Sequence, residues 1–282
     1  MRKALAIGLL ALLCLPACSR LSVAWRFGPW MVEKDAAERL AWPDAQRPRL
    51  HQAVGAWAKE MGRQVAPVLA SAARAVAAAV EAHDDHAAAV RLLGAAQHAW
   101  TAAATAAEAP AARLLGLDPP ARAAALAHYY QGKDAKDKAR WSDPDHSAVA
   151  QAKQLMATFK DYAGEANEAQ GRLIVDWARH AAFPGLAYLA WRQGREQALA
   201  ATLAQGAEPV LLQALLHDWW VGHASRPAAL RDAMNAYYAR LAENLEALLR
   251  SLDADQRAYL AHRLRATAQD LDVIARRAWS NG

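Results

Sequence analysis

Cysteine is nearly absent from this 282-residue sequence, which contains only Cys14 and Cys18. Because both lie at the N-terminus, the rest of the chain can form no disulfide and no cysteine-ligated metal site. Neither sign of charge is in large excess, with 33 Lys and Arg against 28 Asp and Glu, so no nucleic-acid-binding surface is predicted. The chain also lacks G-x-S-x-G, H-E-x-x-H and glycine-rich phosphate-binding loops. We therefore expect a non-catalytic protein that carries no cofactor.

Long hydrophobic runs are absent apart from one at the N-terminus. Two basic residues, Arg2 and Lys3, precede an apolar run of about a dozen residues, whereas a membrane-spanning helix needs about 20. This order of charge and apolarity is typical of a secretory signal peptide. The run ends in Leu-Pro-Ala-Cys at Cys18, the pattern of a bacterial lipobox. We expect removal of residues 1–17 as a lipoprotein signal peptide and lipidation of Cys18.

The residues after Cys18 indicate where the lipid anchor would hold the protein. Ser19 follows the cysteine, whereas Asp at this position typically retains lipoproteins in the inner membrane. We therefore expect a protein anchored on the periplasmic face of the outer membrane, with residues 18–29 as a lipidated tether. Acyl chains bury enough methylene groups to hold a domain there durably. Trp25 and Trp30 fit two interpretations: rings that rest on the membrane interface, or rings that pack on the domain.

The composition favours helices throughout the remaining chain. About a quarter of the residues are alanine and β-branched residues are sparse, a combination with high helix propensity and low strand propensity. Small alanines let helices approach closely, and eleven tryptophans supply bulk where packing needs it. We expect an all-α fold over 30–282, either a multi-helix bundle or a curved helical array. If this domain is subdivided, we expect the boundary near 132–145.

Apolar residues spaced by three and four, together with Gly, Pro and capping residues, predict the individual helices. The predicted helices cover about 30–41, 44–82, 86–109, 118–131, 144–163, 168–182, 186–205, a segment from 209, 227–250 and 253–279. Pro67 is expected to divide the second of these into two packed segments or to bend it as one helix. Gly28-Pro29 is expected to break the chain before the first helix, and 110–116 to be a connector. Residues 132–140 are dense in Lys and Asp, which is typical of a solvated helix face or a hinge.

Four helix starts share a short box of similar sequence. The boxes are Trp42–Arg47, Leu117–Arg122, Ala166–Gly171 and Leu252–Arg257. In a capping box, the side chain of the capping residue binds an amide three residues later, and a glutamine there reaches back to the cap amide. The residues that we expect to form these helix-start boxes are Gln46, Asp118, Gln170, Asp253 and Gln256. Unequal spacing between the boxes argues against a solenoid.

The lipobox, the early tryptophans and the Leu-Asp-x-x-Gln-Arg start of the last helix resemble a family of uncharacterised proteobacterial helical lipoproteins, defined only as a domain of unknown function. The resemblance spans most of the chain. The family's box reads roughly Leu-Thr-Pro-Glu-Gln-Arg, whereas Asp253 here replaces the threonine and Trp42 replaces the first leucine. The family implies no activity. The box is also distantly similar to the L-T-x-x-Q motif of periplasmic stress chaperones, which are shorter and act as curved cradles. That likeness implies either client binding or shared capping chemistry alone.

Two groups of histidines are candidate metal or haem ligands. His83 and His86 enclose two aspartates at a helix junction, where they could bind a divalent cation or lie as solvated neighbours of a capping Asp. His217 and His223 enclose an Asp-Trp-Trp segment, which fits a metal or haem pocket or the polar end of a buried helix. Each group offers two imidazoles and no further positioned ligand, so we expect capping and packing roles.

The function expected from these features is binding. We expect an outer-membrane lipoprotein with a role in client protection or envelope assembly, whose partners are the membrane and a periplasmic protein. The alternative is a metal- or haem-binding helical bundle, or a helical enzyme of unknown reaction. Stoichiometric metal or haem in the purified domain would favour the alternative.

Overall fold

The computed structural model describes residues 19–181, 183–206 and 208–280. These residues form ten α-helices and contain no strand, so the predicted all-α fold is confirmed. No helix among them combines the length and the apolarity needed to cross a membrane. The expected lipidation site Cys18 and the expected signal peptide 1–17 lie outside the described residues, and both stay predictions.

The helices follow one another with short connections. They are α2 (Ser19–Arg39), α3 (Arg47–Glu81), α4 (Asp85–Leu115), α5 (Pro119–Ser142), α6 (Pro144–Ala163), α7 (Glu168–His180), α8 (Gly185–Ala204), α9 (Pro209–His217), α10 (Ala228–Arg250) and α11 (Ala254–Ser280). A 3-10 turn (Asp44–Gln46) precedes α3, and a π-helical turn (Asp218–Gly222) follows α9. Proline lies in the first turn of α3, α5, α6 and α9, where its missing amide has no helical partner to lose.

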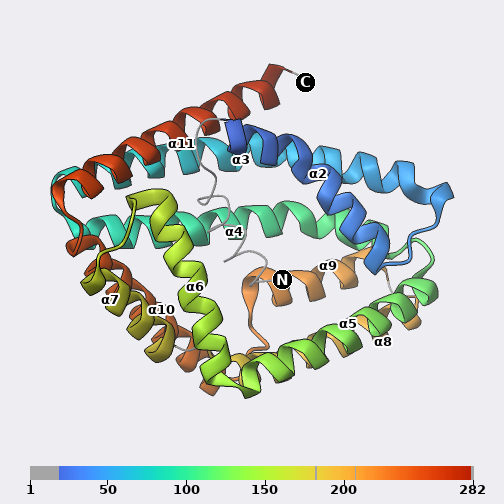
Figure 1. Cartoon of the computed structure of the whole chain (residues 1–282). Helices are drawn as coiled ribbons and strands as arrows, with labels where there is room; N and C mark the ends of the chain where they lie inside the picture. The colour runs from blue at the N-terminus through green and yellow to red at the C-terminus, as the bar shows by residue number, and fades with distance from the viewer. Residues whose placement is uncertain (1–18, 182, 207, 281–282) are drawn as a thin grey trace.

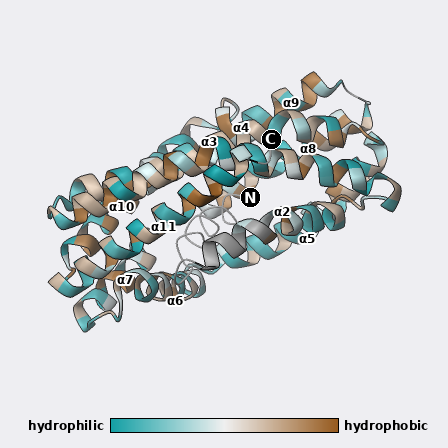
Figure 2. Cartoon of the chain, turned by 90° about the horizontal axis from the view of Figure 1, so that it is seen from above, coloured by the Kyte–Doolittle hydropathy of each residue, from teal (hydrophilic) through white to brown (hydrophobic). Residues whose placement is uncertain are grey.

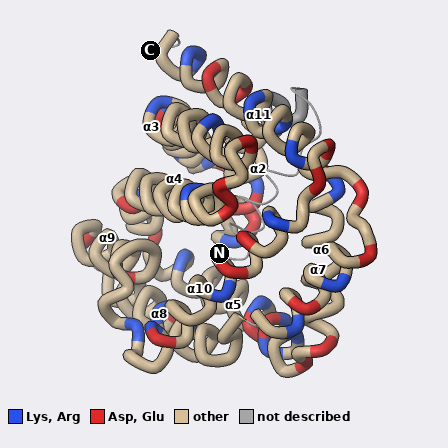
Figure 3. Tube along the Cα trace, turned by 90° about the vertical axis from the view of Figure 1, so that its left-hand side faces the viewer, with Lys and Arg blue, Asp and Glu red and all other residues tan. Residues whose placement is uncertain are grey.

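The long helices α11, α3 and α4 lie side by side across one half of the molecule (Figure 1). Helices α5 and α8 pair along the opposite edge, α6, α7 and α10 connect the two edges at one end, and α9 packs on α4 and α8. Helix α2 lies on α3 and also contacts α11. Every helix mixes apolar and polar residues (Figure 2), as expected when one face is buried. Basic and acidic residues are interspersed along the chain (Figure 3).

Alanine lines the contact between α3 and α11. Ala66, Ala70 and Ala268 are fully buried there. A Cβ added to Gly62 would lie 2.6 Å from the Cβ of Ala278, so a larger residue at this crossing would push the helices apart. Small side chains therefore set the short distance between these two helices, which agrees with the close approach predicted from the alanine content.

Two larger apolar clusters hold the rest of the fold together. One joins α3, α4, α6, α7, α10 and α11 around Val80 and Ile174. The other joins α4, α5, α8, α9 and α10 around Leu212 and Met234. Because α4 and α10 contribute to both clusters, the two ends of the molecule are packed through shared helices.

Two predicted breaks are wrong, because the prolines lie inside continuous helices. Helix α2 runs through Pro29, so residues 19–29 are helical rather than an irregular leader. Helix α4 runs through Pro110, so residues 110–116 are not a connector. An internal proline loses one backbone hydrogen bond, and core residues packed on both sides of Pro110 offset that loss. Pro67 likewise lies within the single helix α3.

Residues 132–140 continue α5 instead of forming a hinge. Helix α5 extends to Ser142, and the chain then turns at Asp143. The Asp143 side chain caps α6 by accepting a hydrogen bond from the amide of His146 at 2.9 Å. The turn between α5 and α6 lies within 132–145, and the subdivision of the domain there stays a prediction.

Candidate functional site

Two of the four helix-start boxes fold as reciprocal capping boxes. At the start of α7, Asn167 Oδ1 accepts from the Gln170 amide and Gln170 Oε1 accepts from the Asn167 amide, both at 2.9 Å. At the start of α11, Asp253 Oδ1 accepts from the Gln256 amide at 2.8 Å, and Gln256 Oε1 accepts from the Asp253 amide at 3.2 Å. Gln170, Asp253 and Gln256 thus lie where capping chemistry places them.

The two capping boxes also face each other. Gln170 Nε2 donates to Gln256 Oε1 at 2.7 Å, and Gln256 Nε2 donates to Gln170 Oε1 at 3.2 Å. Each glutamine also donates to a backbone carbonyl next to the other box. Gln170 donates to Ser251, two residues before the capping Asp253, at 2.9 Å. Gln256 donates to Glu165, two residues before the capping Asn167, at 3.0 Å. The pattern has local two-fold symmetry. Gln170 is fully buried, and both donors and both acceptor positions of its amide are used. We call this arrangement of Gln170 and Gln256 the glutamine pair.

The other two boxes meet through an arginine. Arg122 is fully buried in α5 and donates to the carbonyls of Leu40 and Ala41 and, at 3.2 Å, to Gln46 Oε1. Its guanidinium lies 4.1 Å from the ring centre of Trp42. Desolvation by burial lowers the pKa of the Arg122 guanidinium. Gln46 therefore connects the two boxes instead of capping a helix.

The capping predicted for Asp118 and Gln46 is wrong. Neither side chain makes a capping hydrogen bond at the start of its helix. Asp118 is left-handed, with φ of 65°, and is followed by Pro119 and Pro120. Because proline has no amide hydrogen, the first turn of α5 offers fewer donors to a capping carboxylate. The box at Asp118 therefore has a capping residue in its sequence, but its own two prolines leave that residue without a capping hydrogen bond.

Arg257, at the end of the α11 box, forms a buried ion pair with Asp85 of α4. Its Nη1 lies 2.7 Å from Asp85 Oδ1, and its Nη2 lies 3.1 Å from Oδ2. The guanidinium also donates to the carbonyls of Val80 at 3.3 Å and Leu249 at 2.9 Å. Arg257 and Arg122 occupy the same position in their boxes, and each joins its helix to distant carbonyl groups.

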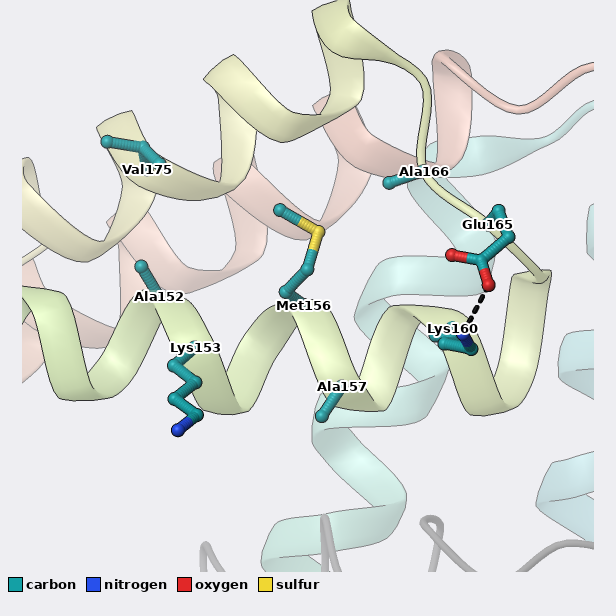
Figure 4. A pocket seen from close by; sticks show the side chains of 8 residues that line it. All are labelled: Ala152, Lys153, Met156, Ala157, Lys160, Glu165, Ala166 and Val175. Atoms are coloured by element: carbon teal, nitrogen blue, oxygen red, sulfur yellow. Dashed lines mark ion pairs between the residues drawn. The ribbon is translucent and has the colours of Figure 1, made fainter.

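A groove of about 420 Å³ lies between α6 and α7 (Figure 4). Met156 reaches from α6 toward α7, which carries Val175 on the other wall. Lys153 and the ion pair between Lys160 and Glu165 border the groove. The lining residues are Ala152, Lys153, Met156, Ala157, Lys160, Glu165, Ala166 and Val175. Because Gln256 binds the Glu165 carbonyl, the glutamine pair fixes the loop that ends this groove. We call it the α6–α7 groove.

A second groove, of about 380 Å³, lies between α3 and α4. It is lined by Glu60, Gln64, His98, Thr101, Ala102, Thr105 and Ala106. Polar side chains make up most of this lining, and the Gln64 amide donates to Glu60. The α6–α7 groove is therefore the better candidate for an apolar ligand.

A buried cluster of charges joins α5 to α8, in a segment whose sequence suggests a solvated face. Arg192, 3 % exposed, pairs with Asp137 at 2.6 Å, with Glu196 at 2.9 Å and with Asp134. Lys133 lies 2.6 Å from Asp137. The pKa of the Glu196 carboxyl is raised to about 8, because burial raises it more than the neighbouring Arg192 lowers it, and Asp134 also raises it. Neither groove includes these residues, so the cluster is an ion network that holds two helices together.

His83 and His86 have separate surroundings and do not form part of a metal site in the described residues. His86 Nδ1 lies 2.9 Å from Glu246 Oε2 of α10, whereas His83 sits in the turn before α4 with φ of 56°. Asp84 caps α4 by accepting from the Ala87 amide at 3.0 Å. Within the ranges that the structure describes, no three metal-ligating side chains lie close enough to hold an ion.

The second histidine group forms the polar end of α9. His217 Nδ1 lies 3.0 Å from the buried carboxyl of Glu108. Asp218 accepts from the Ser225 amide at 2.9 Å and from the Ser225 hydroxyl, which closes the π-helical turn. His223 has φ of 56°, and its ring lies edge-on to Trp191, with ring centres 5.8 Å apart. The geometry fits the interpretation of a polar helix end.

No family model, curated protein or solved structure matches this chain.

Sequence reasoning missed the contacts between helices. The charged run of α5 carried a usable signal, since Lys133 and Asp137 lie four residues apart, as do Arg192 and Glu196. The shared arginine of the boxes was a second signal, since a charged residue that recurs at one position of a buried turn needs a partner. Nothing in the sequence indicates the α6–α7 groove, which exists only because two helices pack there.

Proposed function

We propose that the protein is an outer-membrane lipoprotein, anchored through Cys18, that binds apolar segments of other polypeptides in the periplasm. In this role it protects clients from aggregation or assists envelope assembly, and it catalyses no reaction. The lipobox supports the proposed location at the outer membrane. The absence of catalytic motifs from the sequence and the α6–α7 groove support the binding role.

The observation that carries the proposal is the apolar surface of the α6–α7 groove. Its alanines, Met156 and Val175 give a floor without a buried charge, and its volume lies in the range of ligand sites. Val149 is 69 % exposed and lies seven residues before Met156, which places it on the same face of α6 two turns away. This surface suits the apolar side chains of a helix or an extended segment. Methionine adapts to ligands of different shape.

The lysines beside the groove would favour segments with acidic residues. Lys153 lies at the rim, and Lys160 reaches Glu165 across the groove's end. Both α6 and α7 are held by the core and by the glutamine pair, so little ordering is needed when a segment binds. Exposed lysines attract weakly in salt, and the dependence of binding on ionic strength should be shallow.

An aggregation assay with an unfolded client tests the binding role. The purified protein, without nucleotide, should slow light scattering by the client. Met156→Glu places a charge in the groove, and Val149→Glu places one beside the groove on the same face of α6; each should weaken this protection several-fold. Val210→Glu is the matched control, because Val210 is 76 % exposed on α9, outside the groove.

Two results would overturn the binding role. The first is a wild-type protein that leaves aggregation unchanged at several-fold excess. The second is equal protection by the groove variants and the Val210→Glu control. Because Met156 packs partly into the core, its variant must also retain the wild-type melting temperature. Val149→Glu changes a mostly exposed side chain and provides the test if Met156→Glu is unstable.

Membrane anchoring through Cys18 is tested separately with Cys18→Ser. Without acyl chains the protein should leave the membrane fraction, because scattered exposed side chains do not replace two or three buried acyl chains. Cell fractionation at high salt measures this. A variant that still sediments with the outer membrane would contradict the interpretation of Cys18 as the lipid anchor.

A further inference from the structure

Helix α2 exposes an apolar stripe immediately after the predicted anchor. Phe27, Trp30 and Met31 are 53 %, 59 % and 61 % exposed, and their spacing of three and four places them on one face of the helix. Trp25 lies in the same helix but packs against the clusters that α3 forms with α11 and with α4. At about 100° per residue, the stripe lies roughly opposite Trp25 around the helix. Helix α2 therefore packs one aromatic face on the neighbouring helices and leaves another exposed. We call Phe27, Trp30 and Met31 the α2 stripe.

A second exposed tryptophan, Trp279, lies on α11, which contacts α2. All eleven tryptophans lie in the described ranges, and Trp30 and Trp279 are the two that are exposed, at 59 % and 64 %. Trp279 follows Ala278, and both Ala278 and Trp25 approach Gly62, where α2, α3 and α11 meet (Figure 1). Tryptophan is the side chain enriched at membrane interfaces, because its ring is apolar and its N–H is polar.

Charge along α2 also points toward an anionic surface. The residues nearest Cys18 include Arg20 and Arg26 and no acid, whereas the acids of α2 begin at Glu33. Lys34 lies over the Trp30 ring, 5.6 Å from its centre. Basic residues next to an anchor are attracted to anionic lipid headgroups.

We infer that the α2 stripe lies on the phospholipid surface, with α2 nearly parallel to the membrane. This inference rests on the lipid anchor of the proposed function. Helix α2 begins one residue after Cys18, and Met31 lies about 18 Å along the helix from Ser19 at 1.5 Å per residue. Interfacial helices sink only about 5–10 Å into the headgroup region, so an upright α2 would hold Met31 in water. A flat α2 brings the whole stripe into the interface and fixes the orientation of the domain.

Labelled cysteines test this orientation in the full lipoprotein. The mature chain offers no free thiol once Cys18 is lipidated, so Trp30→Cys and Leu211→Cys each carry a single environment-sensitive fluorophore. Leu211 is 59 % exposed on α9, the same exposure as Trp30, which makes it a matched control. Each protein is reconstituted into vesicles of phosphatidylethanolamine and phosphatidylglycerol. We expect the label at position 30 to be quenched several-fold more by lipid-borne nitroxide, and several-fold less by iodide, than the label at position 211.

Flotation of the wild-type protein with the vesicles separates the two proposals. If it floats and both labels are equally quenched by iodide, the orientation is wrong and the anchor stands. If it does not float, the anchor fails and the orientation fails with it. A label at position 30 that is shielded from both quenchers would show that protein covers the stripe, which also overturns the inference.

Discussion

The glutamine pair gives a quantitative test of how α7 and α11 meet. Gln170 and Gln256 each make four side-chain hydrogen bonds, two of which they share. At about 1 kcal/mol of net stability per hydrogen bond, Gln170→Ala or Gln256→Ala alone should lower the free energy of unfolding by about 4 kcal/mol. The double variant removes six bonds in all, so it should lose about 6 kcal/mol instead of the additive value of about 8 kcal/mol.

The coupling of about 2 kcal/mol is the quantity to measure, by urea unfolding of the wild type, both single variants and the double variant. An osmolyte present in every sample keeps the double variant folded. Gln213→Ala, which changes an exposed glutamine of α9, should alter stability by less than about 0.5 kcal/mol. Additive losses from the two glutamines would refute the contact between them.

Three further substitutions test other parts of the fold. Burial raises the pKa of Glu196 to about 8 from 4.5, so ionising it opposes folding, and stability should fall as pH rises between these values. Glu196→Gln should flatten that decline in thermal melts recorded across pH, and an unchanged profile would contradict it. Asp118→Gly should raise the melting temperature by about 2 °C, because glycine adopts a φ of 65° without strain; a lower melting temperature would refute this. Arg257→Met leaves Asp85 buried without its partner and should lower the free energy of unfolding by about 3–5 kcal/mol, whereas a loss below about 1 kcal/mol would argue against the buried pair.

The helices could be predicted because helix signals are local. Alanine content and apolar spacing favour helix over a few turns, and the starts of α6 and α7 follow from the capping residues Asp143 and Asn167. The helix breaks predicted at Pro29 and Pro110 were wrong because the prediction rested on the cost of an internal proline in an isolated helix, about 3 kcal/mol. Packing of the neighbouring turns on other helices offsets that cost, and such packing cannot be predicted from a short stretch of sequence.

Only the capping boxes of the candidate site could be predicted from the sequence, whereas the contacts between helices could not. The chemistry of a capping box lies within four residues, so Gln170 and Gln256 could be recognised one at a time. Their contact joins residues 86 positions apart, and the Arg257–Asp85 pair joins residues 172 positions apart. Such contacts depend on how helices cross. The α6–α7 groove depends on the same crossings.

The packing of α11 along α3 has a consequence for how the protein is made. Arg63 Nε donates to the carbonyl of Ala278, 215 residues later, so the ribosome completes α3 long before its partner exists. Until then the alanine-lined face of α3 is uncovered. Contacts of such long separation form slowly, and a nascent chain that waits for them exposes apolar surface. The newly made chain should therefore need a holding factor until α11 is synthesised, and a nonsense mutation that removes only α11 should send the product to proteolysis.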